Sequence, residues 1–159
     1  MKAVQEGKKI PAISLFNQEG EKISLKNYLG DQYLLLYFYP KAMTPGCTTQ
    51  ACDLRDSMEE FQKRNITIFG ISPDKVEKLK KFIVKEELNF DLLSDEDHEV
   101  SLAFNSYGKK KLYGREYMGV MRNSFLVDLE GRLVATFEKV KPKEHCQQIL
   151  DYFDENLAQ

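Results

Sequence analysis

A short apolar run at residues 34–39, stopped by Pro40 and followed by a helical pattern, constrains the fold of this chain more than any other feature. Every position of the run is apolar or aromatic, which is typical of a strand buried on both faces. A second, mostly apolar run at residues 66–72 follows the helical pattern. Because a strand, a helix and a strand in this order pair in parallel, the sequence predicts an α/β fold.

The helical pattern between these two runs begins at a cysteine. Small or apolar residues recur at positions 47, 51, 54, 58 and 61, the spacing of one helix face, so we expect a helix from Cys47 to about residues 64–65. In the first turn of a helix, unpaired backbone N–H groups and the positive end of the helix dipole favour a thiolate. Cys47 is therefore the leading candidate for a catalytic residue.

The rest of the chain continues the alternation of strands and helices. We expect an N-terminal β-hairpin, a further helix and short strand, a second hairpin, and a last helix that Pro142 opens. The hairpins are expected at 13–16 with 23–25 and at 123–128 with 132–137, the helix at 75–87 and the strand at 90–93. Residues 107–114 are expected to form a mobile loop.

Neither a repeat nor a linker interrupts this order, so residues 1–159 are predicted to form a single domain. A chain of this length buries roughly 70% of its unfolded surface. A central mixed sheet flanked by helices, with a cysteine at the first long strand-to-helix junction, indicates a thioredoxin-like fold with an N-terminal β-hairpin extension.

Charge and cysteine content exclude several classes of function. With 23 basic and 25 acidic residues the net charge is −2, which favours neither nucleic acid nor an anionic membrane as partner. The sequence shows neither the apolar core of a signal peptide nor the 18 or so apolar residues of a membrane span. Three cysteines are few for a disulfide-stapled fold. We therefore expect a soluble cytoplasmic protein with a small or neutral substrate.

A second cysteine, Cys52, lies five positions after Cys47. On a regular helix this spacing separates the two Cα atoms by roughly 8.5–9 Å, whereas a disulfide needs them within about 7 Å. If both cysteines are helical when reduced, bonding them requires the first turns of the helix to unwind. Cys52 shares a helix face with Arg55, Asp56 and Glu59, so we expect it on the solvent side.

The pattern of Pro40, Thr44 and Cys47, P-x-x-x-T-x-x-C, resembles the active-site signature of the peroxiredoxins. The spacing of Cys47 and Cys52 resembles that of the subgroup called bacterioferritin comigratory protein or peroxiredoxin Q. Segments 37–41, 70–72, 89–95 and 122–128 also resemble family segments. The resemblance therefore covers nearly the whole chain.

The resemblance implies a thiol peroxidase that reduces hydrogen peroxide and organic hydroperoxides without a metal or other cofactor. Cys47 would be oxidised to a sulfenic acid, and Cys52 would resolve it as an intramolecular disulfide that thioredoxin reduces. The intramolecular pairing resembles monomeric members of the subgroup, so a monomer is expected.

Three other residues receive roles through the same resemblance. Arg122 matches the family's arginine, and a fixed cation there would stabilise the negative charge that develops along the S–O–O axis. The Thr44 hydroxyl would hydrogen-bond the thiolate and the peroxide, and Pro40 would shield the sulfur.

Each of these residues also has a plainer interpretation. Cys47 alone could be an inert core cysteine, and Cys52 a tolerated exposed one. Thr44 could be a turn or cap residue, and Arg122 an ordinary arginine at a strand end.

Other features that could carry chemistry are not expected to do so. Cys146 lacks the Val-Cys-Pro context of a C-terminal resolving cysteine and is expected in the core. His98 and His145 show neither metal-ligand nor Cys–His spacing and are taken as non-catalytic. The lysines at 109–111 are expected on a solvated face.

A competing function of another class is a redox-switched sensor or holdase that uses the same disulfide. It would be oxidised stoichiometrically without rapid turnover, whereas a peroxidase would turn over many times with thioredoxin. A small metal module is disfavoured because the cysteines fall on different predicted faces.

Overall fold

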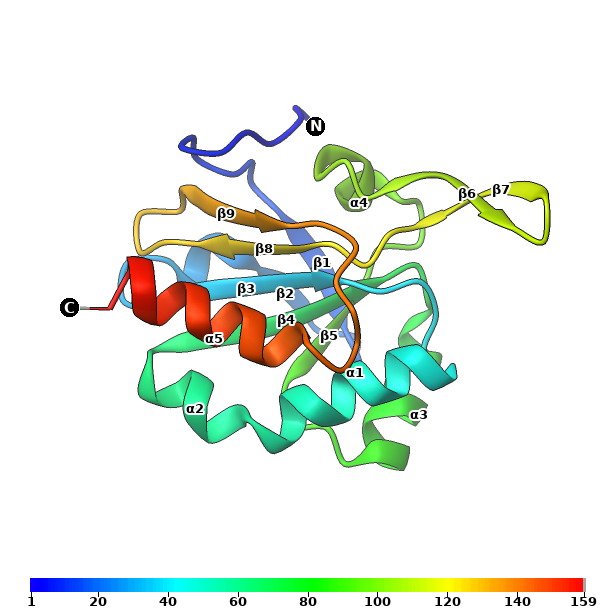
Figure 1. The fold of residues 1–159 in the computed structure, drawn as a ribbon, viewed down its shortest axis with the longest axis horizontal. Coiled ribbons are helices and arrows are strands. Elements are labelled where there is room, and N and C mark those ends of the chain that lie inside the picture. The colour runs from blue at the N-terminus through cyan, green and yellow to red at the C-terminus, as the bar shows by residue number, and fades with distance from the viewer. Residues whose placement is uncertain (159) are drawn as a thin grey trace.

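A seven-stranded mixed sheet forms the centre of the protein in a computed structural model that describes residues 1–158 (Figure 1). Its strand order is β2-β1-β5-β4-β3-β8-β9, and β3, β4 and β5 are parallel while the outer strands are antiparallel. The strands are β1 (Ser14–Asn17), β2 (Lys22–Ser24), β3 (Tyr33–Phe38), β4 (Ile66–Ser72), β5 (Asp91–Ser94), β8 (Ser124–Val127) and β9 (Leu133–Phe137). The predicted α/β fold and both hairpins of this sheet are confirmed.

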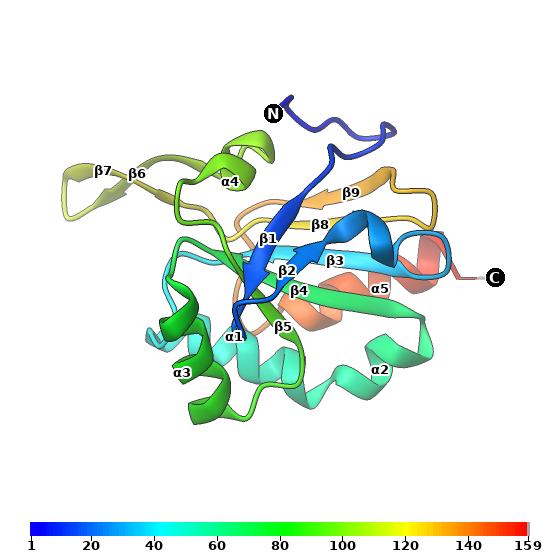
Figure 2. The same ribbon diagram turned by 180° about the vertical axis from the view of Figure 1, so that it is seen from behind.

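Helices cover the two faces of the sheet unequally (Figure 2). Four helices lie on one face, whereas a short helix, a 3₁₀ turn and the N-terminal segment lie on the other. The four are α1 (Pro45–Asp56), α2 (Met58–Lys63), α3 (Val76–Glu86) and α5 (His145–Asn156), and the others are α4 (Glu99–Ala103) and η1 (Leu25–Tyr28). Across residues 1–158, none of the helices combines the length and apolar character needed to cross a membrane.

Strand β3 contributes to both layers of the core, as its apolar run predicts. Leu35 and Tyr37 pack toward α1, α2, α3 and α5, whereas Leu34, Leu36 and Phe38 pack toward α4 and the N-terminal segment. These side chains are at most 1% exposed. The end of β3, where the catalytic candidates begin, is therefore held rigidly from both sides.

The helix predicted from Cys47 to residues 64–65 is broken into α1 and α2 at Ser57. Ser57 ends α1 with φ −99° and ψ 6°, and its N–H donates to Asp53 and Leu54 carbonyls. The apolar stripe passes through the break, because Leu54 and Phe61 are both fully buried. Periodicity alone therefore did not reveal the interruption.

The prediction of a mobile loop at residues 107–114 is wrong. The structure has a regular hairpin of β6 (Tyr107–Leu112) and β7 (Arg115–Val120), which projects from the body of the protein (Figures 1 and 2). Tyr113 and Gly114 form its turn with φ of 52° and 78°, the positive values that a tight hairpin connection requires. The last helix also differs, because α5 begins at His145 and not at Pro142.

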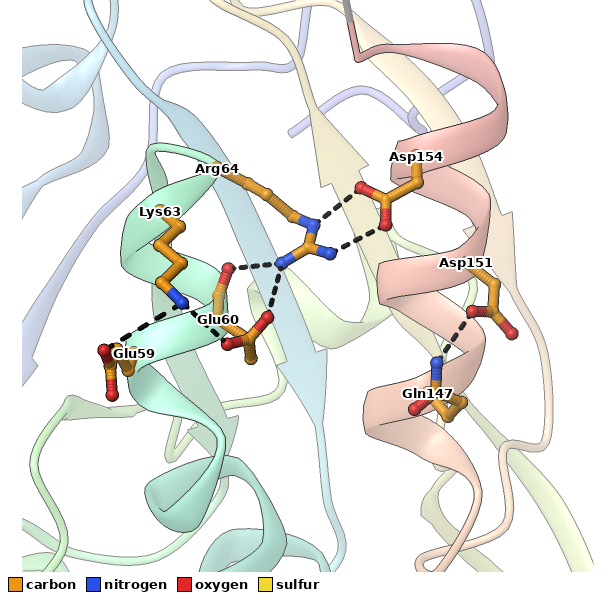
Figure 3. A network of polar contacts seen from close by, with 7 residues as sticks. All are labelled: Glu59, Glu60, Lys63, Arg64, Gln147, Asp151 and Asp154. Atoms are coloured by element: carbon orange, nitrogen blue, oxygen red, sulfur yellow. Dashed lines mark hydrogen bonds and ion pairs between the residues drawn. The ribbon is translucent and has the colours of Figure 1, made fainter.

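An ion pair fixes α5 against the end of α2 (Figure 3). Arg64 donates from Nε and Nη2 to the two carboxylate oxygens of Asp154, each at 2.7 Å, and from Nη1 to Glu60. This hydrogen bonding holds the pKa of Asp154 below its usual value. This two-point geometry ties the C-terminal part of α5 to the end of α2, while the first turn of α5 carries His145 toward the site described below.

Replacing Gly70 by alanine should lower the free energy of unfolding by about 1–3 kcal/mol. A Cβ at Gly70 would lie 2.8 Å from Leu92 Cδ2 and 2.9 Å from the ring of Tyr37, both in the buried core. Urea unfolding measures the change. Gly108→Ala is the matched control, because its Cβ would meet only the flexible end of Met121, at 3.2 Å. A Gly70→Ala protein as stable as the wild type would contradict this packing.

Candidate active site

The first turn of α1 brings Cys47 to the end of strand β3. Thr44 is the N-cap and Pro45 opens the helix, so the first intrahelical bond runs from the Thr48 N–H to the Thr44 carbonyl at 2.8 Å. The N–H groups of Gly46 and Cys47 thus have no acceptor within the helix. The Cys47 side chain is buried, with 1% of the residue exposed. The sulfur therefore lies in a sheltered place close to helix-end donors, as the sequence predicts.

Arg122, two residues before β8, reaches this turn of α1. Its Nη1 donates to Gln50 Oε1 at 3.2 Å, and a Cβ on Gly46 would lie only 2.7 Å from its Nη2. Gly46 and Gln50 are one helical turn apart and flank Cys47 in the sequence, so the guanidinium lies against the turn of α1 that carries the cysteine. The sequence indicated Arg122 but not Gln50, and it gave no reason for a glycine at position 46.

The loop that carries Pro40 and Thr44 is tied down by the segment after β4. The Ala42 N–H donates to Asp74 Oδ2 at 2.8 Å, and the Ser72 hydroxyl donates to the same oxygen at 2.8 Å. The Thr44 hydroxyl donates to the Lys41 carbonyl at 2.8 Å. To donate to a peroxide, this hydroxyl proton must turn away from Lys41, so the role predicted for Thr44 stays a prediction.

Cys52 is half-buried and lies against the end of α3. Its Sγ is 3.7 Å from Glu86 Oε2, and Arg55 donates to the Glu86 carbonyl. Burial raises the pKa of Cys52, Arg55 opposes that shift, and Glu86 adds to it. The predicted solvent position is thus only partly correct, because Glu86 covers the thiol.

Both cysteines are free thiols within the continuous helix α1. The condition for local unwinding is therefore met, because helical residues five apart lie too far from each other for a disulfide. Unwinding near Cys52 must also break the bond from Asn89 Nδ2 to the Arg55 carbonyl, 3.2 Å long.

Comparison with known proteins identifies the family. The AhpC/TSA family model matches residues 6–136. Peroxiredoxin Bcp of Escherichia coli K12 is 46% identical, with 98% of this chain and 99% of that protein covered, and peroxiredoxin Bcp of Bacillus subtilis is 48% identical, with 92% and 93% covered. The chain belongs to the AhpC/TSA family. It is a peroxiredoxin of the Bcp subgroup, and thus a thiol peroxidase.

Solved structures agree with this assignment. The bacterioferritin comigratory protein of Xanthomonas campestris, whose alkyl peroxide reduction activity has been studied structurally, superimposes with a TM-score of 0.86 at 32% identity, over 95% of this chain and 98% of that one. A PrxQ mutant of Xylella fastidiosa gives a TM-score of 0.91 at 27% identity, over 99% of this chain and all of that one. The thioredoxin-like peroxiredoxin fold is confirmed.

The third cysteine of this peroxiredoxin is a core residue, as predicted. Cys146 lies on the buried face of α5 and is 5% exposed. Burial, with a further contribution from Asp53, holds the pKa of the Cys146 thiol far above its usual range. Cys146 therefore stays protonated.

His145, taken as non-catalytic in the sequence analysis, is buried next to the site. None of its surface is exposed, its Nδ1 lies 3.3 Å from Gln50 Nε2, and its Nε2 lies 2.7 Å from the Ser124 hydroxyl. Burial lowers the pKa of His145 to about 4, so the ring is neutral at pH 7. His98, by contrast, is half-buried and stacks on Tyr107 with ring centroids 4.1 Å apart.

Two open cavities lie near the site, one against the first turn of α1 and the other against Arg122. One, of about 390 Å³, is lined by Pro45, Gly46, Thr49 and residues 141–144. The other, of about 420 Å³, is lined by Arg122, Met121, Val140 and four lysines, three of them at 109–111. The prediction of a solvated face is therefore wrong for Lys110. This residue is half-buried, and its Nζ donates to the Val120 carbonyl at 3.0 Å.

The Gly46→Ala substitution should slow the reaction of Cys47 with hydrogen peroxide by about tenfold or more, because an added Cβ displaces the Arg122 guanidinium. Stopped-flow measurement of the second-order rate constant tests this. Thermal unfolding provides the control, since the variant should melt within a few degrees of the wild type. An unchanged rate constant would show that the contact does not set the position of Arg122.

Acidification should destabilise the protein through His145. The unfolded chain protonates this histidine near pH 6.5 and the folded protein only near pH 4, so stability present above pH 6.5 is lost as the pH falls toward 4. The loss is on the order of 3 kcal/mol. Urea unfolding should therefore show a shallower pH dependence for His145→Asn than for the wild type. The control, Ile149→Ala, keeps His145 and should retain the wild-type slope, and parallel curves for all three proteins would refute the assignment.

Proposed function

We propose that this peroxidase uses Cys47 as its peroxidatic residue. The Cys47 thiolate attacks one peroxide oxygen, an S–O bond forms and the O–O bond breaks. The sulfur is oxidised to a sulfenic acid, and the leaving hydroxide or alkoxide takes up a proton to become water or an alcohol. The observation that carries this proposal is the Arg122 guanidinium, which lies against Gly46 and Gln50 on the turn of α1 that carries Cys47.

The residues around Cys47 supply what the transition state needs. Negative charge moves from sulfur toward the leaving oxygen, and a fixed guanidinium with helix-end N–H groups stabilises it in a site that excludes water. The Thr44 hydroxyl donates a hydrogen bond to the peroxide after its bond to the Lys41 carbonyl breaks. Pro40 shields the sulfur. The cavity lined by Pro45 and Pro142 offers apolar contact for an alkyl group, which supports organic hydroperoxides as substrates beside hydrogen peroxide.

Cys52 then resolves the sulfenic acid. Its sulfur attacks the sulfur of Cys47, an S–S bond forms and water leaves, so that two thiols have been oxidised by one peroxide. Unwinding of α1 brings the two sulfurs together. Cys146 is excluded from this step because its thiol is buried in the core and remains protonated.

Thioredoxin is the electron donor that we assign to the cycle, which runs in a monomer in the reducing cytoplasm. Both reacting thiols come from one chain, so no second subunit is needed. An unwound segment presents the disulfide to an external dithiol, which reduces it by exchange through a mixed disulfide.

The first test is the site of oxidation. One equivalent of hydrogen peroxide, quenched within a second, should give an internal disulfide in the tryptic peptide 42–55, which contains Cys47 and Cys52. Mass spectrometry without reducing agent detects it as a loss of two hydrogens, and Cys146 should stay free. Reduced thiols throughout, or oxidation of Cys146, would contradict the mechanism.

The Cys52→Ser variant separates the two steps. It should still consume one equivalent of peroxide and then stall as a sulfenic acid or overoxidise, so turnover with thioredoxin should fall to background. Cys146→Ser is the matched control and should turn over like the wild type. A complete thioredoxin-driven cycle in Cys52→Ser would remove Cys52 from the resolving role.

A further inference from the structure

A chain of three polar contacts connects the active-site arginine to helix α5. Arg122 Nη1 donates to Gln50 Oε1 at 3.2 Å, Gln50 Nε2 meets His145 Nδ1 at 3.3 Å, and His145 Nε2 meets the Ser124 hydroxyl at 2.7 Å. Gln50, His145 and Ser124 have no exposed surface. The chain thus joins α1, α5 and the start of β8 inside the protein.

The chemistry of these groups allows only one direction for the hydrogen bonds. A guanidinium has donors and no acceptor, so the carbonyl end of the Gln50 amide must face Arg122. The NH₂ end of the amide then faces His145, whose Nδ1 must accept. Burial keeps the ring neutral, so its single proton lies on Nε2 and is donated to Ser124.

The acceptor at His145 Nδ1 therefore decides how the Gln50 amide is turned. Without it, the NH₂ group would lose its buried partner, and the amide could rotate to place that group against the guanidinium, donor against donor. The ring of Tyr37 lies against His145 with centroids 5.8 Å apart, and its own hydroxyl is buried and protonated. Among residues 1–158 the Tyr37 hydroxyl has no hydrogen-bond partner, so it does not compete with Gln50 for His145 Nδ1.

We propose that His145 is a positioning residue for peroxide reduction, which acts by fixing the amide of Gln50 and, through it, the guanidinium of Arg122 beside Cys47. The proposal rests on the role proposed above for Arg122. His145 itself does not touch the reacting atoms. A buried imidazole on the apolar face of α5 thereby has a function that packing alone does not require.

Two substitutions of His145 distinguish this role from simple packing. Asparagine places its side-chain oxygen near the position of Nδ1 and can still accept from Gln50, whereas glutamine places its amide near Nε2 and serves Ser124 instead. We expect His145→Gln to lower the second-order rate constant for hydrogen peroxide about tenfold, and His145→Asn to keep it within about threefold of the wild type. Stopped-flow oxidation of the full chain measures both. Equal losses in the two variants would overturn the proposal.

A double-mutant comparison tests the route through Gln50. If His145 acts only through that amide, Gln50→Leu and the double variant Gln50→Leu/His145→Gln should react at the same rate. A further loss in the double variant would overturn the proposal. Ile149→Ala, on the same buried face of α5, is the control and should lower the melting temperature without changing the rate constant.

A measurement on the unaltered protein does not depend on any variant folding. Nitrogen-15 NMR of the histidine rings should show a neutral His145 with its proton on Nε2 and a bare Nδ1, and a proton on Nδ1 would overturn the proposal.

The Arg122→Met variant separates this proposal from the one it rests on. If that variant reacts at the wild-type rate, the catalytic role of Arg122 fails. If it is slow while His145→Gln is not, only the positioning role fails.

Discussion

The approach of the Arg122 guanidinium to the backbone of Gly46 is the contact on which the site depends. It brings the chain before β8 against the first turn of α1, and only a residue without a Cβ allows it. The pairing of the central strands brings the two segments together. The parallel pairing of β3 with β4 and the antiparallel pairing of β3 with β8 place the end of β3 next to the residues that precede β8.

The buried polar chain connects the candidate site to residues outside the signature. Gln50 and His145 are 95 positions apart in sequence, yet their side chains meet at 3.3 Å. Helix α5 packs by its apolar face, pairs with Arg64 and places His145 beside the ring of Tyr37. If His145 positions Arg122 as proposed, helix α5 acts on the site through Gln50.

Local pattern was sufficient for the parts of this molecule that depend on local physics. The apolar run before Pro40 predicted a strand buried on both faces, and the stripe that begins at Cys47 predicted the buried face of α1 and α2.

The features that the sequence did not predict depend on more than local pattern. The break at Ser57 was not predicted because the apolar stripe continues across it. The β6–β7 hairpin escaped because its turn residue Tyr113 adopts a positive φ that tyrosine rarely takes. Gln50 and His145 escaped because their roles arise only from contacts between distant segments.

In the proposed cycle, helix α1 must meet two opposing demands, because it holds Cys47 for the first step and unwinds for the second. Its contacts differ along its length. The first turn and Gln50 are tied to Arg122 and His145 inside the protein, where lost hydrogen bonds are costly. Cys52 and Arg55 are tied to Glu86 and Asn89 near the surface, where water replaces a lost partner cheaply. In the proposed cycle, the contacts of Cys52 and Arg55 are therefore less costly to break, when α1 unwinds, than those of Gln50.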